Sequence, residues 1–485
     1  MRFFPVFQAL GAVLCIFGLT MLLPLFVSWH LDDGALPAYD EALGITLLCG
    51  GILWLVTRPK QKVELHARDG FLLVSLTWLI TPIFGALPLY LQLPELSFTD
   101  AYFESISGLT TTGSTVLVGL DALPLSINLW RTFLHWIGGM GVIVLVVAVL
   151  PLLGIGGRQI YKAETPGPMK ETSLTPRIAE TAKGLWTVYL VLTVACMLSL
   201  WAAGMAGWEA VIHGFTIMGL GGFSSHDASL GHFNSLPIEM VTMVFALLAG
   251  LNYATHFLAL RNRSVLPYRR DPELPYFYGV LIASIVGVTA YLLILDAYSD
   301  TGLALRHVAF HAVSLATSLG LATMDYGQWP MFAQVWILFL GSFAACSGST
   351  GGGIKMMRAI LLYKMVFREI LFAMHPRAVS PIRLGEQTVG EHVLRAVLAF
   401  SFMYMVSIVS LTLILLASGM ELVTAFSAIV ATLNNTGPGL GSVGPAGNFA
   451  GLNDFQTWVC SFAMILGRLE IFTLLVVLTP AFWRK

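Results

Sequence analysis

Long apolar stretches, each the length of a membrane-spanning helix, dominate this 485-residue sequence. A helix needs about 20 mostly apolar residues to cross the hydrocarbon core of a bilayer. Hydrophobic residues make up 56% of the chain and charged residues only 11%, too few to cover the surface of soluble cores. We therefore expect an all-α polytopic membrane protein in contact with the lipid bilayer, and exclude a soluble enzyme, a nucleic-acid binder and a disordered chain. About ten stretches meet the length requirement: 5–29, 41–57, 69–92, 130–154, 184–206, 235–260, 275–297, 331–353, 391–419 and 456–482.

Basic residues gather in alternate connections between these stretches. Arg2 precedes the first stretch, and the other groups lie within 58–68, 158–183, 261–270, 355–395 and 484–485. Only Arg131, Arg306 and Arg468, of the 26 Lys and Arg residues, fall elsewhere. Cytoplasmic loops of membrane proteins are enriched in Lys and Arg, so both termini are predicted to be cytoplasmic. The opposite loops are rich in Asp and Glu, and such a surface attracts cations.

Four of the outer connections share an unusual pattern. Each contains a further apolar stretch of about 10–15 residues, which is too short to span the membrane and suits a re-entrant half-helix. These stretches end in polar segments with glycine: Phe103–Gly113, Phe215–Gly222, Phe310–Gly320 and Ala431–Gly437. Each lies between two full spans, which predicts a unit of span, pore helix, loop and span that occurs four times around one pathway. The expected organisation is an N-terminal transmembrane pair at 1–67 and four repeats at 68–183, 184–273, 274–390 and 391–485.

Backbone carbonyl groups are the chemistry that such loops offer. The C-terminal end of a helix carries partial negative charge, and four half-helices can point these ends at one axis. The loops that follow can turn carbonyl oxygens inward and replace the hydration shell of a monovalent cation. Glycine is favoured there because it accepts backbone dihedral angles that a Cβ penalises. Ordinary re-entrant turns with glycine caps explain a single such loop better, but four at matched positions favour a pore.

Five sequence motifs accompany this fourfold pattern: Ser107–Gly113, His135–Gly141, Gly221–Asp227, Gly348–Lys355 and Asn434–Gly441. Together they resemble the Trk/Ktr/HKT superfamily of cation transporters, and specifically the membrane subunits of its Trk branch. The additional N-terminal pair of spans is similar to the Trk branch rather than to the shorter Ktr branch. The resemblance implies gated, channel-like potassium uptake across the cytoplasmic (inner) membrane, with K+ as the transported ion and no organic cofactor in this chain.

The same resemblance implies one selectivity-filter loop in each repeat, with potassium bound by backbone carbonyls at and just before each glycine. The implied ion-binding residues are Thr111, Thr112 and Gly113; Leu220, Gly221 and Gly222; Ser318, Leu319 and Gly320; and Asn435, Thr436 and Gly437. Relatives often carry Ser-Thr-Gly-Gly in the second loop, where this chain has Gly219-Leu220-Gly221-Gly222. This difference changes side chains and leaves the backbone carbonyls in place, so we expect it to affect ion selectivity rather than the ability to transport ions. Each loop has one short filter run, so we expect K+ and Rb+ to be favoured only moderately over Na+.

The eighth apolar stretch is interrupted by a small, polar run. The run consists of Gly348, Ser349, Thr350, Gly351, Gly352 and Gly353. Each glycine disfavours a helix by about 1 kcal/mol, so a continuous helix is not expected there. By composition, a mobile loop below the filter and a helix end followed by an interfacial helix are equally good interpretations. The resemblance implies an intramembrane gating loop at this position.

Arg468 falls in the middle of the last apolar stretch. A charge at the bilayer centre costs about 2.5–3.5 kcal/mol, so this side chain should face the pore or a partner. We predict that Arg468 raises the barrier to cations and holds the glycine-rich run 348–353 through its carbonyls. Arg131 and Arg306 are interpreted as anchors or loop partners, and His135 and His256 as packing residues.

Two other functional classes are weighed against a gated channel. An ion-coupled symporter, driven by H+ or Na+, needs a chain of intramembrane acids, but only Glu470 lies well inside a predicted span. An integral membrane enzyme is disfavoured because the chain lacks Walker A, H-E-x-x-H and G-x-S-x-G motifs. The resemblance implies a homodimer and a separate cytoplasmic ring of the TrkA type that binds ATP or NAD and controls opening. The basic connections 158–183 and 261–270 either dock this ring or serve only as topology signals.

Overall fold

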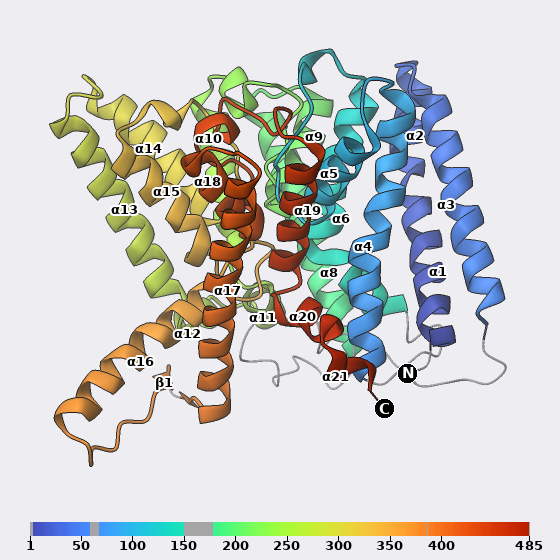
Figure 1. Cartoon of the computed structure of the whole chain (residues 1–485). Helices are drawn as coiled ribbons and strands as arrows, with labels where there is room; N and C mark the ends of the chain where they lie inside the picture. The colour runs from blue at the N-terminus through green and yellow to red at the C-terminus, as the bar shows by residue number, and fades with distance from the viewer. Residues whose placement is uncertain (1–2, 59–66, 150–177, 386, 485) are drawn as a thin grey trace.

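The computed structural model describes residues 3–58, 67–149, 178–385 and 387–484, and nearly all regular structure in it is helical (Figure 1). This confirms the all-α prediction; two short strands, β1 (Arg383–Leu384) and β2 (Gln387–Thr388), pair antiparallel. The α-helices are α1 (Phe3–Thr20), α2 (Leu22–Leu31), α3 (Leu36–Val56), α4 (Ala67–Gln92), α5 (Phe98–Leu109), α6 (Leu125–Val149), α8 (Ile178–Ala202), α9 (Gly207–Gly219), α10 (Leu236–Gly250), α11 (Tyr253–Asn262), α12 (Leu266–Arg270), α13 (Leu274–Ile294), α14 (Thr301–Ala316), α15 (Met331–Phe343), α16 (Met356–Met374), α17 (Glu391–Ala417), α18 (Leu422–Leu433), α19 (Asp454–Arg468), α20 (Phe472–Leu478) and α21 (Pro480–Trp483).

Several helices have the length and apolar character of membrane spans, and the chain is a multi-pass membrane protein. Within the described residues, 6 helical segments meet both criteria, or up to 8 if each of two bent helix pairs is one span. Eight of the ten predicted spans coincide with these segments, and the predicted spans 235–260 and 456–482 each match one bent pair. The other two are 130–154, whose end lies outside the described residues, and 331–353. The predicted span 331–353 is helical only to Phe343, and the predicted span from 130 begins earlier, at Leu125.

Two predicted spans are sharply bent. The stretch 235–260 forms α10 and α11, which meet at 93°, and Asn252 caps the start of α11 by accepting a hydrogen bond from the Ala254 backbone N–H. The stretch 456–482 forms α19 and α20, which meet at 112°. Glu470 and Ile471 at this bend have positive φ angles of 54° and 59°, which end the right-handed helix.

The N-terminal helices cross closely because small residues line their contact. A Cβ added to Gly11 in α1 would lie 2.6 Å from the backbone nitrogen of Trp54 in α3. A Cβ on Gly50 would lie 2.9 Å from the sulfur of Cys15. Small residues allow such close backbone approach between membrane helices, so this pair packs as one unit.

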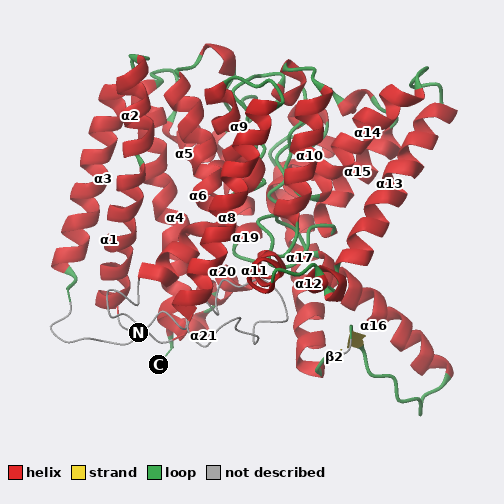
Figure 2. Cartoon of the chain, turned by 180° about the vertical axis from the view of Figure 1, so that it is seen from behind, coloured by secondary structure: helices red, strands yellow, loops and turns green. Residues whose placement is uncertain are grey.

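Four short helices begin at one face of the molecule and end inside it (Figures 1 and 2). They are α5, α9, α14 and α18, with 12, 13, 16 and 12 residues. At about 1.5 Å per residue, none is long enough to cross a bilayer core of about 30 Å. Side chains of Ser97, Asp300 and Glu421 cap the starts of α5, α14 and α18.

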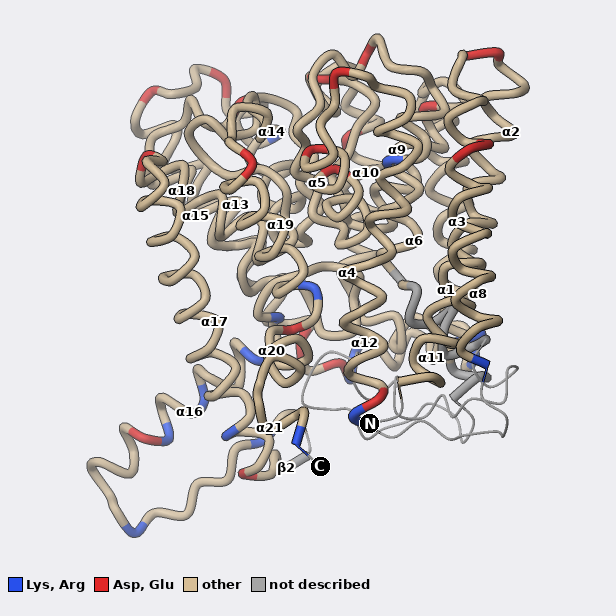
Figure 3. Tube along the Cα trace, turned by 45° about the vertical axis from the view of Figure 1, so that its right-hand side comes forward, with Lys and Arg blue, Asp and Glu red and all other residues tan. Residues whose placement is uncertain are grey.

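Charge is divided between the two faces of the molecule. Most Lys and Arg residues lie toward the face that also holds both chain ends, whereas Asp and Glu gather at the opposite face (Figure 3). We call these the basic face and the acidic face. Of the predicted basic connection 158–183, residues 158–177 lie outside the described part of the chain. The other connection, 261–270, forms the end of α11 and all of α12 at the basic face.

Candidate functional site

The four predicted loops share one backbone conformation. We call residues 110–113, 219–222, 317–320 and 434–437 glycine loops 1 to 4. In each loop a non-glycine residue with left-handed φ stands two positions before a glycine with positive φ. The left-handed residues are Thr111 (54°), Leu220 (53°), Ser318 (61°) and Asn435 (52°), and the glycines are Gly113 (83°), Gly222 (89°), Gly320 (80°) and Gly437 (94°).

Backbone hydrogen bonds repeat in the same way and fix where each short helix ends. The residue after each left-handed position donates its N–H to a carbonyl five residues earlier. The donors and acceptors are Thr112 to Ser107 (2.8 Å), Gly221 to Thr216 (3.0 Å), Leu319 to Ser314 (2.7 Å) and Thr436 to Ala431 (2.9 Å). This is the pattern of a left-handed helix cap. The left-handed cap therefore lies two residues before the glycine with positive φ in each loop, so that glycine is not required by the helix cap.

These glycines allow close contact between neighbouring loops. A Cβ added to a loop glycine would collide with a carbonyl oxygen of the next loop, in a closed cycle. Gly113 faces the oxygen of Gly221, Gly222 that of Leu319 at 2.5 Å, Gly320 that of Thr436, and Gly437 that of Thr112 at 2.8 Å. We call the oxygens of Thr112, Gly221, Leu319 and Thr436 the carbonyl ring. Only glycine lets four backbones approach this closely around one axis.

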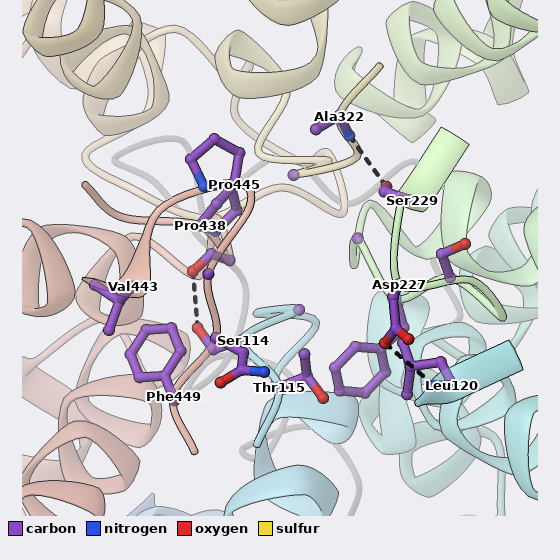
Figure 4. A pocket seen from close by; sticks show the side chains of 18 of the residues that line it. Ser114, Thr115, Leu120, Asp227, Ser229, Ala322, Pro438, Val443, Pro445 and Phe449 are labelled. Atoms are coloured by element: carbon purple, nitrogen blue, oxygen red, sulfur yellow. Dashed lines mark hydrogen bonds between the residues drawn. The ribbon is translucent and has the colours of Figure 1, made fainter. Parts of the chain in front are cut away.

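Side chains tie the first and last loops together and so close the cycle. Asn435 donates from Nδ2 to Thr112 Oγ1 at 2.9 Å, and Ser114 Oγ donates to the Gly437 carbonyl at 2.8 Å (Figure 4). All four loop glycines line one cavity, which extends from the ring toward the acidic face. The C-terminal ends of α5, α9, α14 and α18 lead into this ring, and their partial negative charge favours a cation there.

Arg131 and Glu104 form a buried ion pair beside this cavity. Both side chains are fully buried, and Arg131 approaches Glu104 to 2.8 Å. Arg131 also donates to the Ser224 carbonyl at 3.0 Å, while Glu104 accepts from Thr115 Oγ1 and the Val116 N–H. Arg131, predicted to be an anchor or loop partner, thus connects the segments that follow glycine loops 1 and 2. A buried ion pair needs such extra hydrogen bonds to offset the loss of water.

His135, predicted to be a packing residue, joins the end of α5 before glycine loop 1 to the residue that follows loop 2. Its Nε2 accepts a hydrogen bond from the Phe223 N–H at 3.2 Å, so Nδ1 carries the proton and donates to the Gly108 carbonyl at 2.9 Å. A Cβ on Gly221 would overlap the imidazole ring. The sequence could not reveal this role, because both partners are backbone atoms of distant segments.

We expect His135→Ala to reduce ion discrimination as well as stability. The change leaves the Gly108 carbonyl and the Phe223 N–H without a partner, and each unpaired buried group costs about 1–3 kcal/mol. The ratio of Rb+ to Na+ uptake in liposomes should fall by roughly 5-fold, which corresponds to about 1 kcal/mol. His256→Ala is the matched control, since His256 is also bonded through both nitrogens, to Tyr268 and Leu248, outside the glycine loops. An unchanged ratio in folded His135→Ala protein would contradict the bridging role.

The segment 344–355 is non-helical and contacts residues that precede the carbonyl ring along the chain. It separates α15 from α16, which confirms that no helix is continuous across 348–353, and the break begins earlier than this run, at Ala344. Thr350 Oγ1 donates to the Met218 carbonyl at the end of α9 at 3.3 Å. The Gly352 N–H donates to Ser318 Oγ at 2.8 Å, and a Cβ on Gly352 would overlap the Asn434 carbonyl oxygen. We call 344–355 the crossing segment, since it contacts glycine loops 3 and 4 and the helix end before loop 2.

Arg468 and Lys355 hold the crossing segment. Arg468 donates to the Thr350 carbonyl at 3.0 Å, to Thr111 Oγ1 at 3.2 Å and to the Gly138 carbonyl. Lys355 donates to the Gly351 carbonyl. Arg468 is the last residue of α19, at the 112° bend near the middle of the predicted span 456–482. Its charge reaches the crossing segment because the helix ends there.

Glu273 contacts the same segment from the start of α13. This carboxylate is buried and accepts a hydrogen bond from the Ser347 N–H at 2.8 Å. Burial raises the pKa of Glu273 to about 7, against the opposing effect of the Ser347 hydrogen bond. The neighbouring Asp271 carboxylate adds to the increase in pKa. The ionised form of Glu273 is therefore less favourable in the folded protein than in water.

We expect Glu273→Gln to remove a pH dependence of stability. A raised carboxyl pKa means that the folded state binds the proton more tightly, so stability is full at low pH and falls as pH rises through about 7. The native protein should therefore lose thermal stability between about pH 4.5 and pH 7, and the glutamine variant should lose less. Thermal unfolding in detergent, followed by tryptophan fluorescence, measures the difference. Parallel pH curves for the two proteins would rule out the assigned role of Glu273.

The remaining predicted residues have plain structural roles. Arg306 pairs with Glu239 at 2.7 Å and bonds Asn234, and so anchors α14 to α10 as predicted. Glu470, the carboxylate inside the last predicted span, forms an ion pair with Arg358 at 2.6 Å. The guanidinium of Arg358 also lies 4.0 Å from the centre of the Phe400 ring. These contacts join α16, α17 and the α19–α20 bend below the crossing segment.

Comparison with known proteins identifies the family. The family model of TrkH cation transport proteins matches residues 39–485. The Trk system potassium uptake proteins TrkH of Vibrio parahaemolyticus and of Escherichia coli K12 are 46% and 45% identical, and each match covers 100% of both chains. The crystal structure of the potassium transporter TrkH from Vibrio parahaemolyticus matches with a TM-score of 0.90 at 43% identity, covering 100% of both chains. These relatives are transport proteins and not enzymes, and the chain belongs to the TrkH family of cation transport proteins.

Proposed function

We propose that this chain takes up potassium across the cytoplasmic membrane through a gated, channel-like pore, with K+ as its transported ion. The observation that carries the proposal is the closed cycle in which each loop glycine faces a carbonyl oxygen of the next loop. The names of the relatives, which are potassium uptake proteins, agree with it. Four repeats of span, pore helix, filter loop and span would surround the pore, and they would be formed by residues 68–183, 184–273, 274–390 and 391–485.

Carbonyl oxygens suit a large monovalent cation. They can replace the water of a weakly hydrated ion such as K+ or Rb+, whereas carboxylate clusters favour divalent ions. The ligands would be the backbone carbonyls of Thr111 to Gly113 and of the equivalent residues in the other three loops. The carbonyl ring would form one layer of these ligands. A single short filter run in each loop gives moderate rejection of Na+. Leu220 in loop 2 keeps the shared left-handed backbone, so the carbonyls of that loop remain available.

The crossing segment would act as the gate. It is held by hydrogen bonds from Arg468 and Lys355 and by single hydrogen bonds to Met218, Ser318 and Glu273, and loss of this set would release it. A cytoplasmic regulatory ring that binds ATP or NAD would control the opening, and two copies of the chain would form a homodimer. The basic face would be cytoplasmic, together with both termini, since Lys and Arg gather there (Figure 3).

Uptake of radiolabelled Rb+ into liposomes loaded with potassium tests the proposal. The purified chain should transport Rb+ without added energy and without a proton or sodium gradient. Uptake that requires such a gradient would favour the alternative, an ion-coupled symporter. If the chain alone is inactive, addition of the regulatory subunit with nucleotide distinguishes a closed gate from an absent pore. No flux under either condition, with well-folded protein, contradicts the proposed function.

A further inference from the structure

Beside the cavity mouth, three side chains offer metal-binding atoms to one point. Asp121 lies in the short turn after glycine loop 1, and His226 and His232 lie in the segment after loop 2. One ligand atom from each residue lies within 4.8 Å of those of the other two. His226 also lines the cavity into which all four loop glycines open. The cluster therefore borders the proposed ion pathway at the acidic face.

The geometry brings both imidazoles to the same carboxylate. His226 Nδ1 is 2.5 Å and His232 Nδ1 is 3.9 Å from the same Asp121 oxygen. The two imidazole rings are parallel within 2°, with centroids 3.5 Å apart. Two ligands on one tetrahedral ion with bonds of about 2.0–2.1 Å lie about 3.3 Å apart, so Asp121 need move by less than about 1 Å. One imidazole must also rotate, because the planes of two stacked rings do not meet at one ion, and the exposed His232 side chain can do so. The Asp121 side chain is 49% exposed, and its other oxygen accepts a hydrogen bond from the Asp227 N–H at 3.2 Å.

A fourth residue stands where metal sites place an orienting group. Glu209 Oε2 lies 3.5 Å from His226 Nε2, the ring nitrogen on the side away from Asp121. Ser225 Oγ donates to the same Glu209 oxygen at 2.6 Å and so fixes its position. A carboxylate behind a metal-bound histidine sets its tautomer and strengthens it as a ligand. Solvent reaches the cluster from one side, since the His232 side chain is 47% exposed.

The ligand types indicate the class of ion. Imidazole nitrogen binds Zn2+, Cu2+ and Ni2+ well, whereas K+, Ca2+ and Mg2+ prefer oxygen ligands. Two histidines and one carboxylate leave a fourth position for water, as in three-ligand zinc sites. We propose that Asp121, His226 and His232 form an external site for a divalent transition-metal ion of the zinc class, and that an ion bound there slows cation uptake. The second half rests on the proposed function, because a divalent charge beside the mouth repels monovalent cations.

Two separate measurements test the proposal, on full-length protein with any histidine tag removed. Isothermal titration with ZnCl2 measures binding without reference to transport. Uptake of Rb+ into liposomes with and without external ZnCl2 measures the effect on transport. The variants are His232→Ala and Asp121→Asn, both at half-exposed side chains, and His30→Ala is the matched control. His30 is exposed at the end of α2, on the same face and outside the cluster.

We expect one Zn2+ to bind per native chain and each cluster variant to weaken binding by about 10-fold or more. The same variants should relieve zinc inhibition of Rb+ uptake, and His30→Ala should change neither readout. Equal zinc binding by native and both variant proteins would overturn the site. Zinc binding that depends on the cluster but leaves active uptake unchanged would overturn the inhibitory role. If no preparation transports Rb+, the titration still decides the site while the proposed function fails.

Discussion

The Gly113→Ser variant is expected to lose selective Rb+ uptake, with a rate reduced by roughly 10-fold or more, equivalent to at least about 1.4 kcal/mol in the barrier. A Cβ at this position would overlap the Gly221 carbonyl oxygen. That oxygen is a backbone atom of the carbonyl ring, so it cannot move aside without disturbing the proposed ion ligands. The φ angle of 83° is also one that serine adopts only with strain. Rates for radiolabelled Rb+ and Na+ in liposomes give both the flux and its selectivity.

Gly419→Ser separates the effect on the ring from backbone strain. Gly419 has a φ angle of 89°, close to that of Gly113, but a Cβ there meets nothing within 4 Å. This control variant should be slightly destabilised and should keep its rate and its preference for Rb+. Thermal unfolding and gel filtration confirm that both variants fold. A Gly113→Ser protein with native flux and selectivity would show that the ring does not bind the transported ion.

Local sequence was sufficient to locate the glycine loops. Short apolar stretches that end in a polar segment with glycine predicted the ends of α5, α9, α14 and α18. The closed cycle of loops could not be predicted in the same way. It depends on contacts such as Gly437 with the Thr112 carbonyl, which join residues more than half the chain apart. The left-handed residues, such as Thr111 and Leu220, carry no sequence signal, since threonine and leucine rarely adopt that conformation.

Helix ends inside continuous apolar stretches could not be predicted from hydropathy. The run that contains Arg468 continues through Leu469 and Ile471, so a window of hydropathy reads α19 and α20 as one span. The bend depends on tertiary contacts, among them the ion pair of Glu470 with Arg358 from α16. The crossing segment was predictable, because four glycines within 348–353 oppose a helix whatever the surroundings. Composition left its position below the ring as one of two equal interpretations, since its partners, among them Met218, Ser318 and Glu273, lie in distant segments.

Arg468→Ala is expected to raise cation flux. The variant loses hydrogen bonds from the guanidinium to the Thr350 carbonyl and to Thr111 Oγ1, and so loosens the crossing segment. It also removes a positive charge close to the path of the ion. Hydrogen bonds to charged groups contribute about 1.5–3 kcal/mol, so the population of the open state should rise roughly 10-fold. Rb+ uptake by the chain alone, without regulatory subunit or nucleotide, measures the increase.

Arg468→Lys distinguishes the two causes. Lysine keeps the charge but cannot bridge Thr350 and Thr111 in the fork geometry of the guanidinium. If the bridge holds the gate, the lysine variant should resemble Arg468→Ala; if charge alone opposes the cation, it should resemble the native protein. Arg368→Ala is the control, because Arg368 pairs with Glu391 near the basic end of α17, away from the ring. Unchanged or lower flux in folded Arg468→Ala protein would mean that Arg468 supports the structure of the pore rather than its closure.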